Sequence, residues 1–181
     1  MRIALALALS FALAGAARAD APAAAPAGAA PANPAAAAPN YTPEKTIIVG
    51  PTGKTITVTP ELLAGLDREQ ATMINHGASH IYEGVRLTEL LRLVDAPTGA
   101  RIHADADRDY LVVTGGDGFR AVYSLAETDG SVQRHPVILA DKMDGAPLIP
   151  HDAPYRLVVD GDQKPARSVY AVAKIEVKVL P

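Results

Sequence analysis

The chain has 181 residues, a formal net charge of -3 at pH 7 and no cysteine. An acidic chain is a poor partner for nucleic acid, because binding to phosphates relies on clustered lysine and arginine. The absence of cysteine excludes disulfide bonds, so an exported domain of this sequence must be stabilised by packing alone.

The first 19 residues have the pattern of a secretory signal peptide. A short basic start at Met1-Arg2 precedes an apolar stretch from Ile3 to Ala14, and residues 17–19 form an A-x-A cleavage pattern. The apolar stretch is too short for a permanent membrane span. We therefore predict export to a bacterial periplasm.

An Ala/Pro-rich segment follows the predicted signal peptide. Proline recurs too often for the alanines to form a continuous helix, so residues 20–43 are predicted to be a disordered linker. Residues 44–181 then form one domain, which is long enough to bury a single core.

The first half of this domain alternates short strands and helices. Residues 46–49 and 55–58 are β-branched runs separated by a turn-rich quartet, which predicts a hairpin. Thr59 followed by Pro60 predicts the start of a helix that ends near Leu66. Residues 71–75 predict a further strand, which ends before His76-Gly77.

The second half contains one amphipathic helix and mainly strands. Leucine and valine at 87, 90, 91 and 94 follow helical spacing. Residues 110–114 and 119–123 predict a hairpin across a glycine-rich turn. The remaining predicted strands are residues 137–140, 155–159 and 169–179. The pattern indicates an α+β domain with a mixed β-sheet and short helices.

Several motifs that suggest other functions fail on their spacing. The glycine-rich turn at 115–118 lacks the Lys-Ser/Thr of a phosphate-binding loop. The alternating aspartates at 105, 107 and 109 lack the glycine and glutamate of a calcium loop. His76 and His80 are four residues apart, but Gly77 argues against a helix that would aim both at zinc. No nucleophile elbow is present.

Four blocks resemble the molybdopterin-binding domain of the sulfite oxidase family. They read YEGVRLTELL from residue 82, VVTGGDGFRAVYSLAE from 112, VILADKMDGAPL from 137 and APYRLVVDGDQKPARSVYAVAKIEV from 153. The resemblance implies the family's fold and a pterin-shaped cleft. It also implies a molybdenum ligated by one cysteine thiolate, a soft ligand that suits the metal, near residues 73–77. This chain has no cysteine there or elsewhere.

The resemblance also implies a set of ligand-binding residues. The loop before the last strand supplies a point charge, a planar guanidinium fork and a hydroxyl. Carboxylates and an aromatic ring suit the polar edge and the flat face of a pterin. The predicted ligand-binding residues are Arg167, Lys164, His76, Tyr82, Glu83, Asp117, Asp141 and Ser168.

Simpler interpretations of these residues stay open. Lys164 and Arg167 can be ordinary solvated residues of a surface loop, and Tyr82 suits a core position equally well. Glu83 can pair with a nearby arginine. Asp117 can serve the hairpin turn alone, and His76 can bond to backbone.

The predicted function is that of a periplasmic, non-catalytic binder of a reduced pterin, with no catalytic residue and no molybdenum. The resemblance to small periplasmic, cysteine-free members of the family implies a relay to the periplasmic domain of a membrane-bound cyclic-di-GMP signalling protein. Two alternatives remain: a molybdopterin-dependent oxidoreductase lacking the usual cysteine ligand, and an envelope interaction module with a vestigial cleft.

Overall fold

Two β-sheets and a few short helices make up the described part of the chain. The computed structural model describes residues 42–180. The predicted signal peptide and the predicted linker up to residue 41 lie outside the described residues. None of the helices within residues 42–180 is long and apolar enough to cross a membrane.

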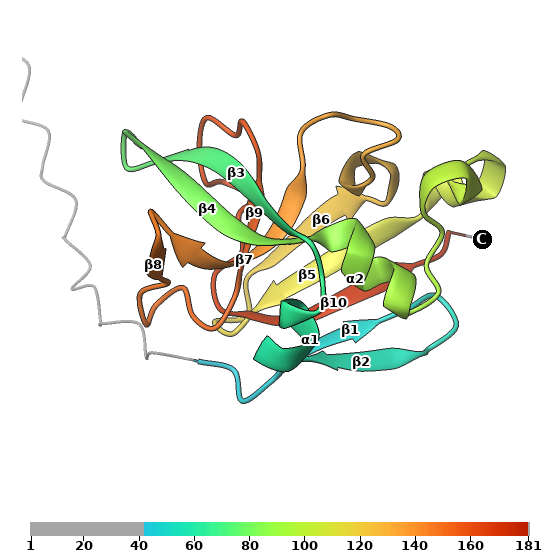
Figure 1. Cartoon of the computed structure of the whole chain (residues 1–181). Helices are drawn as coiled ribbons and strands as arrows, with labels where there is room; N and C mark the ends of the chain where they lie inside the picture. Colours follow the sequence, from blue (N-terminus) through green and yellow to red (C-terminus); the bar gives the residue numbers. More distant parts are fainter. Residues whose placement is uncertain (1–41, 181) are drawn as a thin grey trace, which may run out of the picture. The chain divides into compact units, whose positions relative to one another are not determined.

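The first sheet has five strands in the order β2-β1-β10-β5-β6 (Figure 1). Strands β1 and β10 run parallel, whereas the other neighbours are antiparallel. The sheet is therefore mixed, as predicted. Its strands are β1 (Thr46–Val49), β2 (Thr55–Val58), β5 (Tyr110–Gly115), β6 (Arg120–Ser124) and β10 (Val172–Lys178).

The second sheet contains β3, β4, β7 and β8 in that order, and β9 pairs with β7 as well. All of its strand pairs are antiparallel. Its strands are β3 (Arg68–Asn75), β4 (Ala78–Arg86), β7 (Val137–Met143), β8 (Ala146–Pro147) and β9 (Arg156–Val159).

The helices are short. Helix α1 (Pro60–Ala64) begins as predicted, because the Thr59 hydroxyl accepts a hydrogen bond from the Leu62 amide at 3.2 Å. Helix α2 (Leu87–Leu93) also lies where the spacing predicted it. Three 3-10 helices complete the set: η1 (Gly99–Arg101), η2 (Ala104–Arg108) and η3 (Ala126–Thr128).

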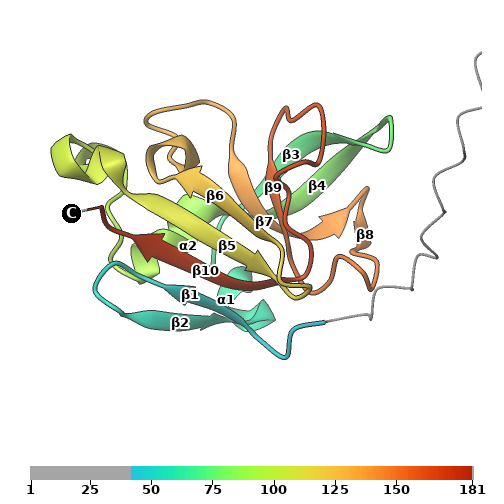
Figure 2. The ribbon, with the colours of Figure 1, turned by 180° about the vertical axis from the view of Figure 1, so that it is seen from behind.

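The main core lies between the two sheets and under α2. Leu90 and Leu91 of α2 are fully buried together with Val113 of β5 and Leu139 of β7. Full burial of such a side chain stabilises the fold by about 1.5–3 kcal/mol. No helix of residues 42–180 covers the opposite face of the first sheet (Figure 2).

The second sheet curls back on itself. The amide of Gly161, just after β9, donates to Thr72 of β3 at 2.7 Å, and the Ile74 amide donates to Asp162 at 3.1 Å. The chain after β9 therefore pairs with the free edge of β3. The enclosed side holds a second, smaller cluster of buried side chains: Ala71, Met73, Tyr82, Ile138, Ala140, Leu148 and Val158.

Strand β4 is the main element that the sequence analysis missed. Residues 78–86 mix polar, charged and apolar side chains without strict alternation. A bulge between Glu83 and Gly84 shifts the register against β7 and disturbs the period-2 pattern. Gly84 allows this close approach, because a Cβ there would lie 2.1 Å from the Leu139 carbonyl oxygen.

Candidate functional site

One arginine is completely enclosed beside the smaller cluster. Arg156, the first residue of β9, has a side chain that is 0% exposed. Its Nε donates to the Ser168 hydroxyl at 2.8 Å, and its Nη1 donates to Asp152 Oδ2 at 2.8 Å and to the Tyr82 hydroxyl at 3.0 Å. Charged side chains are rarely buried unless they are paired. The buried carboxylate of Asp152 supplies the opposing charge.

Two tyrosine rings flank the Arg156 guanidinium. Its central carbon lies 4.2 Å from the ring centroid of Tyr170 and 5.1 Å from that of Tyr82. A cation close to an aromatic ring is attracted to the electron-rich face of that ring. Burial raises the pKa of Tyr82, although the charge of Arg156 acts in the opposite direction. Tyr82 is therefore a neutral hydrogen-bonding group at physiological pH.

Two buried polar atoms beside Tyr82 have no partner. Within residues 42–180, the buried side-chain nitrogen and oxygen atoms without a hydrogen bond are Arg156 Nη2 and Asn75 Oδ1. Asn75 ends β3, and burial is the main cause that raises the pKa of the nearby Tyr82. Each unpaired buried group costs about 1–3 kcal/mol. The cluster thus holds one unmet donor and one unmet acceptor.

Two histidines lie where this cluster approaches solvent. The His80 ring contacts Tyr82 edge-on with 6.5 Å between centroids, and its Nδ1 lies 2.7 Å from Asp144 Oδ2. The His151 ring packs on Tyr170 with 4.8 Å between centroids. The side chain of His151 is 58% exposed. Solvent therefore reaches the edge of the cluster on the Tyr170 side.

A second charged cluster surrounds Arg68. Both terminal nitrogens of Arg68 donate to the Asp141 carboxylate, one of them at 3.1 Å. Glu83 adds a second negative charge that helps to raise the pKa of Arg68, after the Asp141 hydrogen bond and charge. A shallow pocket of about 290 Å³ is lined by Arg68, Glu69, Gln70 and Glu83. The two predicted carboxylates thus gather around an arginine that the sequence analysis did not name.

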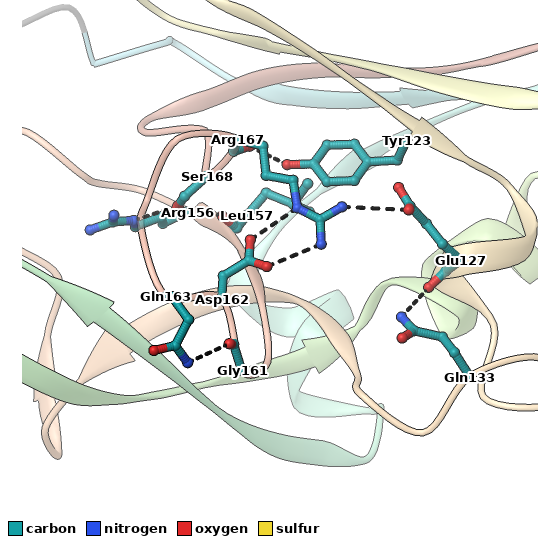
Figure 3. Close-up of polar contacts among 10 residues, drawn as sticks. All are labelled: Tyr123, Glu127, Gln133, Arg156, Leu157, Gly161, Asp162, Gln163, Arg167 and Ser168. Carbon is teal, nitrogen blue, oxygen red and sulfur yellow. Dashed lines mark hydrogen bonds and ion pairs between the residues drawn. The ribbon is translucent and has the colours of Figure 1, made fainter.

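Arg167 lies in a different environment from Arg156 (Figure 3). Its Nε and Nη2 donate to the two oxygens of Asp162 at 2.9 and 3.1 Å, and its Nη1 lies 3.4 Å from Glu127 Oε2. The hydrogen bond to Asp162 is the main cause that raises the pKa of Arg167. The Tyr123 hydroxyl donates to the Arg167 carbonyl oxygen. Two carboxylates therefore already balance this guanidinium.

The other predicted residues lie on exposed turns and loops. His76 and Gly77 join β3 to β4 with φ values of 49° and 81°, as in a type I′ hairpin turn. Asp117 Oδ1 accepts from the Phe119 amide at 2.9 Å and so stabilises its own turn. Lys164 is exposed in the loop after β9.

The structure thus brings only part of the predicted set together. Tyr82 and Ser168 both contact Arg156, whereas Glu83 and Asp141 lie around Arg68. The remaining four residues, Arg167, Lys164, His76 and Asp117, lie outside both groups. Sequence reasoning missed Arg156, Asn75, Asp152 and Tyr170 in the first group and Arg68 in the second. One feature of the sequence could have indicated Arg156, because it is the charged first residue of the otherwise apolar strand β9. In the structure all four residues of β9 are buried.

A family comparison identifies the domain. The model of the "oxidoreductase molybdopterin binding domain" family matches residues 63–179 of the chain. The chain belongs to this family. The match includes every residue of the Arg156 cluster, and it confirms the resemblance that the four sequence blocks indicated.

Solved structures agree with the molybdopterin-binding-domain fold. The crystal structure of the sulfane dehydrogenase SoxCD from Paracoccus pantotrophus matches with a TM-score of 0.54 and 18% sequence identity. The match covers 75% of this chain and 39% of that chain. This similarity confirms the fold, and the chain spans well under half of the SoxCD chain. No curated protein matches the sequence.

The side chains of this family member fit the pterin part of the family's cofactor better than its metal. Molybdenum in the family is expected to need a soft thiolate, and the sequence has no cysteine. Within residues 42–180, no group of three His, Asp or Glu side chains is placed to hold a metal ion. The unpaired atoms of Arg156 and Asn75, in contrast, suit the polar edge of a flat heterocycle, and the half-buried ring of Tyr170 suits its face.

Proposed function

We propose that this protein is a non-catalytic, periplasmic binder of a reduced pterin. The observation that carries the proposal is the Arg156 cluster, in which a buried donor and a buried acceptor lack partners inside a domain of a molybdopterin-binding family. The lack of a cysteine favours binding of the organic part of the cofactor without its metal.

The chain's own residues supply three of the interactions that hold a pterin. Arg156 contributes fixed N–H donors, because Asp152 and Ser168 hold its guanidinium in place. The half-buried ring of Tyr170 lies next to that charge, whereas Tyr82 is fully buried and supplies its hydroxyl to Arg156. Asn75 adds an amide oxygen that accepts a hydrogen bond. These groups bind and orient a ligand, and none of them needs to transfer a proton.

We propose further that pterin binding is relayed to a membrane-bound cyclic-di-GMP signalling protein. The predicted signal peptide and the family resemblance support this part of the proposal. A relay requires that the free and bound states differ in surface or order, and that the ligand prefers one of them. The loop that carries His151 and Asp152 is suited to such a change, because Asp152 pairs with Arg156 and the exposed His151 packs on Tyr170.

Titration with pterins tests the binding proposal. Neopterin and 7,8-dihydroneopterin are titrated into the exported chain by calorimetry, and mass spectrometry identifies any compound that co-purifies from the native host. We expect saturable binding of one pterin per chain, with the reduced form preferred. An absence of binding by both compounds, together with no co-purifying pteridine, would contradict the proposal and favour an interaction module.

Metal analysis separates a binder from an oxidoreductase. We expect protein purified from its own host to contain far less than one molybdenum per chain, and to show no turnover of sulfite or sulfoxides. A variant with Asn75→Cys is a useful companion, since it restores a thiolate near the position that the resemblance assigns to the metal ligand. One molybdenum per chain in the unmodified protein would overturn the non-catalytic proposal.

A further inference from the structure

Strand β6 forms one edge of the first sheet (Figure 2). It pairs with β5 alone, and Arg120–Ser124 keep an unbroken antiparallel register against that strand. No other strand of residues 42–180 pairs with β6. An edge strand of this kind presents a row of unpaired N–H and C=O groups, which is a template for one more strand.

The other sheet edges are shorter or covered. Strand β8 has two residues and β2 has four. The chain after β9 already bonds to β3, and Val169 bonds to Leu157 of β9. Strand β6, in contrast, contains no proline and no bulge, and its central residue, Val122, is 62% exposed. It therefore lacks most of the features that protect edge strands from association.

The hairpin geometry determines which backbone groups of β6 face outward. The Gly115 amide donates to the Phe119 carbonyl oxygen at 2.9 Å. Hydrogen-bonded and non-hydrogen-bonded pairs alternate along an antiparallel ladder, so every second residue counted from Phe119 bonds to β5. The residues between them, Arg120, Val122 and Ser124, therefore direct their N–H and C=O groups away from β5. The side chains of these three residues are exposed as well.

This outward-facing set is self-complementary. Arg120 and Ser124 lie at equal distances in sequence on either side of Val122. A second β6, antiparallel to the first and related by a two-fold axis at Val122, places Val122 opposite its own copy and Arg120 opposite Ser124 of the second copy. Each opposed pair then exchanges both of its N–H···O bonds. A two-fold interface uses the same patch on both chains, so it closes a dimer and leaves no free edge at β6.

The charges at the ends of β6 are complementary in that arrangement. Arg120 is exposed and takes part in none of the ion pairs among residues 42–180. Glu127 lies beside Ser124, because its amide donates to the Ser124 hydroxyl at 3.0 Å. The Glu127 side chain is 34% exposed, and its carboxylate lies 3.4 Å from Arg167. The two-fold axis therefore brings Arg120 of each copy towards Glu127 of the other.

We propose that two copies of this chain associate in solution through β6 and join their first sheets into one continuous sheet. The interface consists of the backbone hydrogen bonds along Arg120–Ser124, the contact between the two Val122 side chains, and the ion pairs of Arg120 with Glu127. An interface one strand wide is small, and small interfaces are typical of weak, reversible complexes. The inference goes beyond the proposed pterin binding and does not rest on it.

Sedimentation velocity of the exported chain at increasing concentration tests the dimer, and Val122→Pro tests the edge. Proline removes the outward-facing N–H of Val122 but no bond to β5, and edge strands tolerate proline at such positions. We expect wild type to shift from monomer to dimer in the micromolar range. Val122→Pro should stay monomeric and keep the melting temperature of the wild-type monomer.

Val122→Lys keeps the test decisive if Val122→Pro does not fold. The variant retains the backbone donor and sets two like charges opposite each other, which destabilises a strand pair. We expect its dimerisation to be at least about tenfold weaker than that of wild type. Thr57→Lys is the control, because Thr57 is exposed on β2 at the opposite edge of the same sheet, and it should dimerise as wild type does.

The cysteine-free sequence allows a direct test of the geometry. Val122→Cys places one thiol on each chain, and hydrogen-bonded antiparallel partners have Cα atoms about 5.5 Å apart. A disulfide bridges that separation. Under mild oxidation we expect Val122→Cys to form a linked dimer in the time in which Thr57→Cys stays largely monomeric.

Charge reversal tests the ends of the strand. Arg120→Glu should weaken dimerisation at least about tenfold, and the double variant with Glu127→Arg should return it to within about threefold of wild type. A wild-type chain that stays monomeric throughout, or a dimer that both Val122→Pro and Val122→Lys leave intact, would overturn the inference. So would Val122→Cys cross-linking to a different protein of the native host in preference to its own copy, because the edge would then take a partner's strand.

Discussion

Two arginines only eleven residues apart on the same stretch of chain have opposite environments. Arg156 is fully buried with one carboxylate partner and one unpaired nitrogen, whereas Arg167 is 41% exposed and pairs with both Asp162 and Glu127. Both lie in the same block of family resemblance, and the sequence-based prediction assigned Arg167 to the ligand. Arg156 carries the unmet hydrogen-bonding capacity. In the proposed site, the missing hydrogen-bond partner of Arg156 is therefore the argument for that arginine, whereas the argument for Arg167 is its place in a motif.

The largest expected effect comes from Arg156→Met. The change removes the buried cation from Asp152 Oδ2 and leaves that carboxylate with only the exposed His151 ring, 2.9 Å from Oδ1. Breaking a buried ion pair in this way costs about 3–5 kcal/mol. The melting temperature should then fall by roughly 10–20 °C. Thermal unfolding measures the change. The double variant with Asp152→Asn should recover a large part of the loss, and an equal loss in the double variant would mean that the pair is not the cause.

Ser168→Ala tests the same side of the comparison with a smaller change. The Ser168 hydroxyl accepts from Arg156 Nε at 2.8 Å and donates to the Leu157 carbonyl oxygen at 2.7 Å. Its removal leaves two buried groups with one partner fewer, at a cost of about 1–3 kcal/mol. Urea unfolding gives this difference directly. Ser168→Cys offers a matched control of similar volume, and unchanged stability in Ser168→Ala would show that water replaces the hydroxyl.

Alkaline pH should destabilise both regions through their tyrosines. Burial is the main cause that raises the pKa of Tyr82 in the Arg156 region and of Tyr123 beside Arg167 above the ordinary value of 10.0. A raised folded-state pKa means that the folded form holds its proton longer than the unfolded form. Stability is therefore complete below pH 10 and falls as the pH rises above it.

Melting curves between pH 8 and 11 measure this alkaline loss. Tyr123→Phe should lower the melting temperature at pH 8, because its hydroxyl no longer donates to the Arg167 carbonyl. The variant should also lose less on going to pH 11 than wild type does. A steeper alkaline loss in Tyr123→Phe would contradict the assignment of the effect to this hydroxyl.

The sequence predicted the architecture more completely than the site. Hairpins 46–58 and 110–124, helix α2 and the strand that ends at Asn75 follow from local periodicity and turn residues. The Arg156 cluster depends on contacts between distant segments, such as Tyr82 with Arg156, 74 residues apart. Local patterns do not contain such pairings. An arginine at the start of an apolar strand indicates that a buried partner exists, but it does not identify that partner.

His76 illustrates the same limit at a single position. The resemblance placed the family's metal ligand near residues 73–77, and His76 was the residue of that stretch with ligand chemistry. In the structure its positive φ of 49° builds the turn between β3 and β4, and the neighbouring Asn75 is half-buried with its Oδ1 atom enclosed. A shift of one residue reverses the direction of a side chain in a strand. The resemblance therefore indicates a region of the chain, and the structure shows which side chains of that region are enclosed.

The smallest expected effect belongs to Arg167→Ala, which tests the other half of the comparison. The sequence-based prediction assigns Arg167 to the ligand and implies a tenfold to hundredfold loss of pterin affinity, equivalent to about 1.4–2.7 kcal/mol. The structure commits its guanidinium to Asp162 and Glu127, so binding a ligand would mean giving up an existing ion pair. We expect a loss of pterin affinity of about threefold or less, and a change in the free energy of unfolding below about 1 kcal/mol because the ion pair is part-exposed.

Calorimetric titration of Arg167→Ala and Arg156→Lys side by side decides between the two arginines. Asp162→Asn is the control, because it removes the main partner of Arg167 without removing Arg167 itself. A larger loss for Arg167→Ala than for Arg156→Lys would reverse the comparison and return the site to the loop that the sequence first indicated.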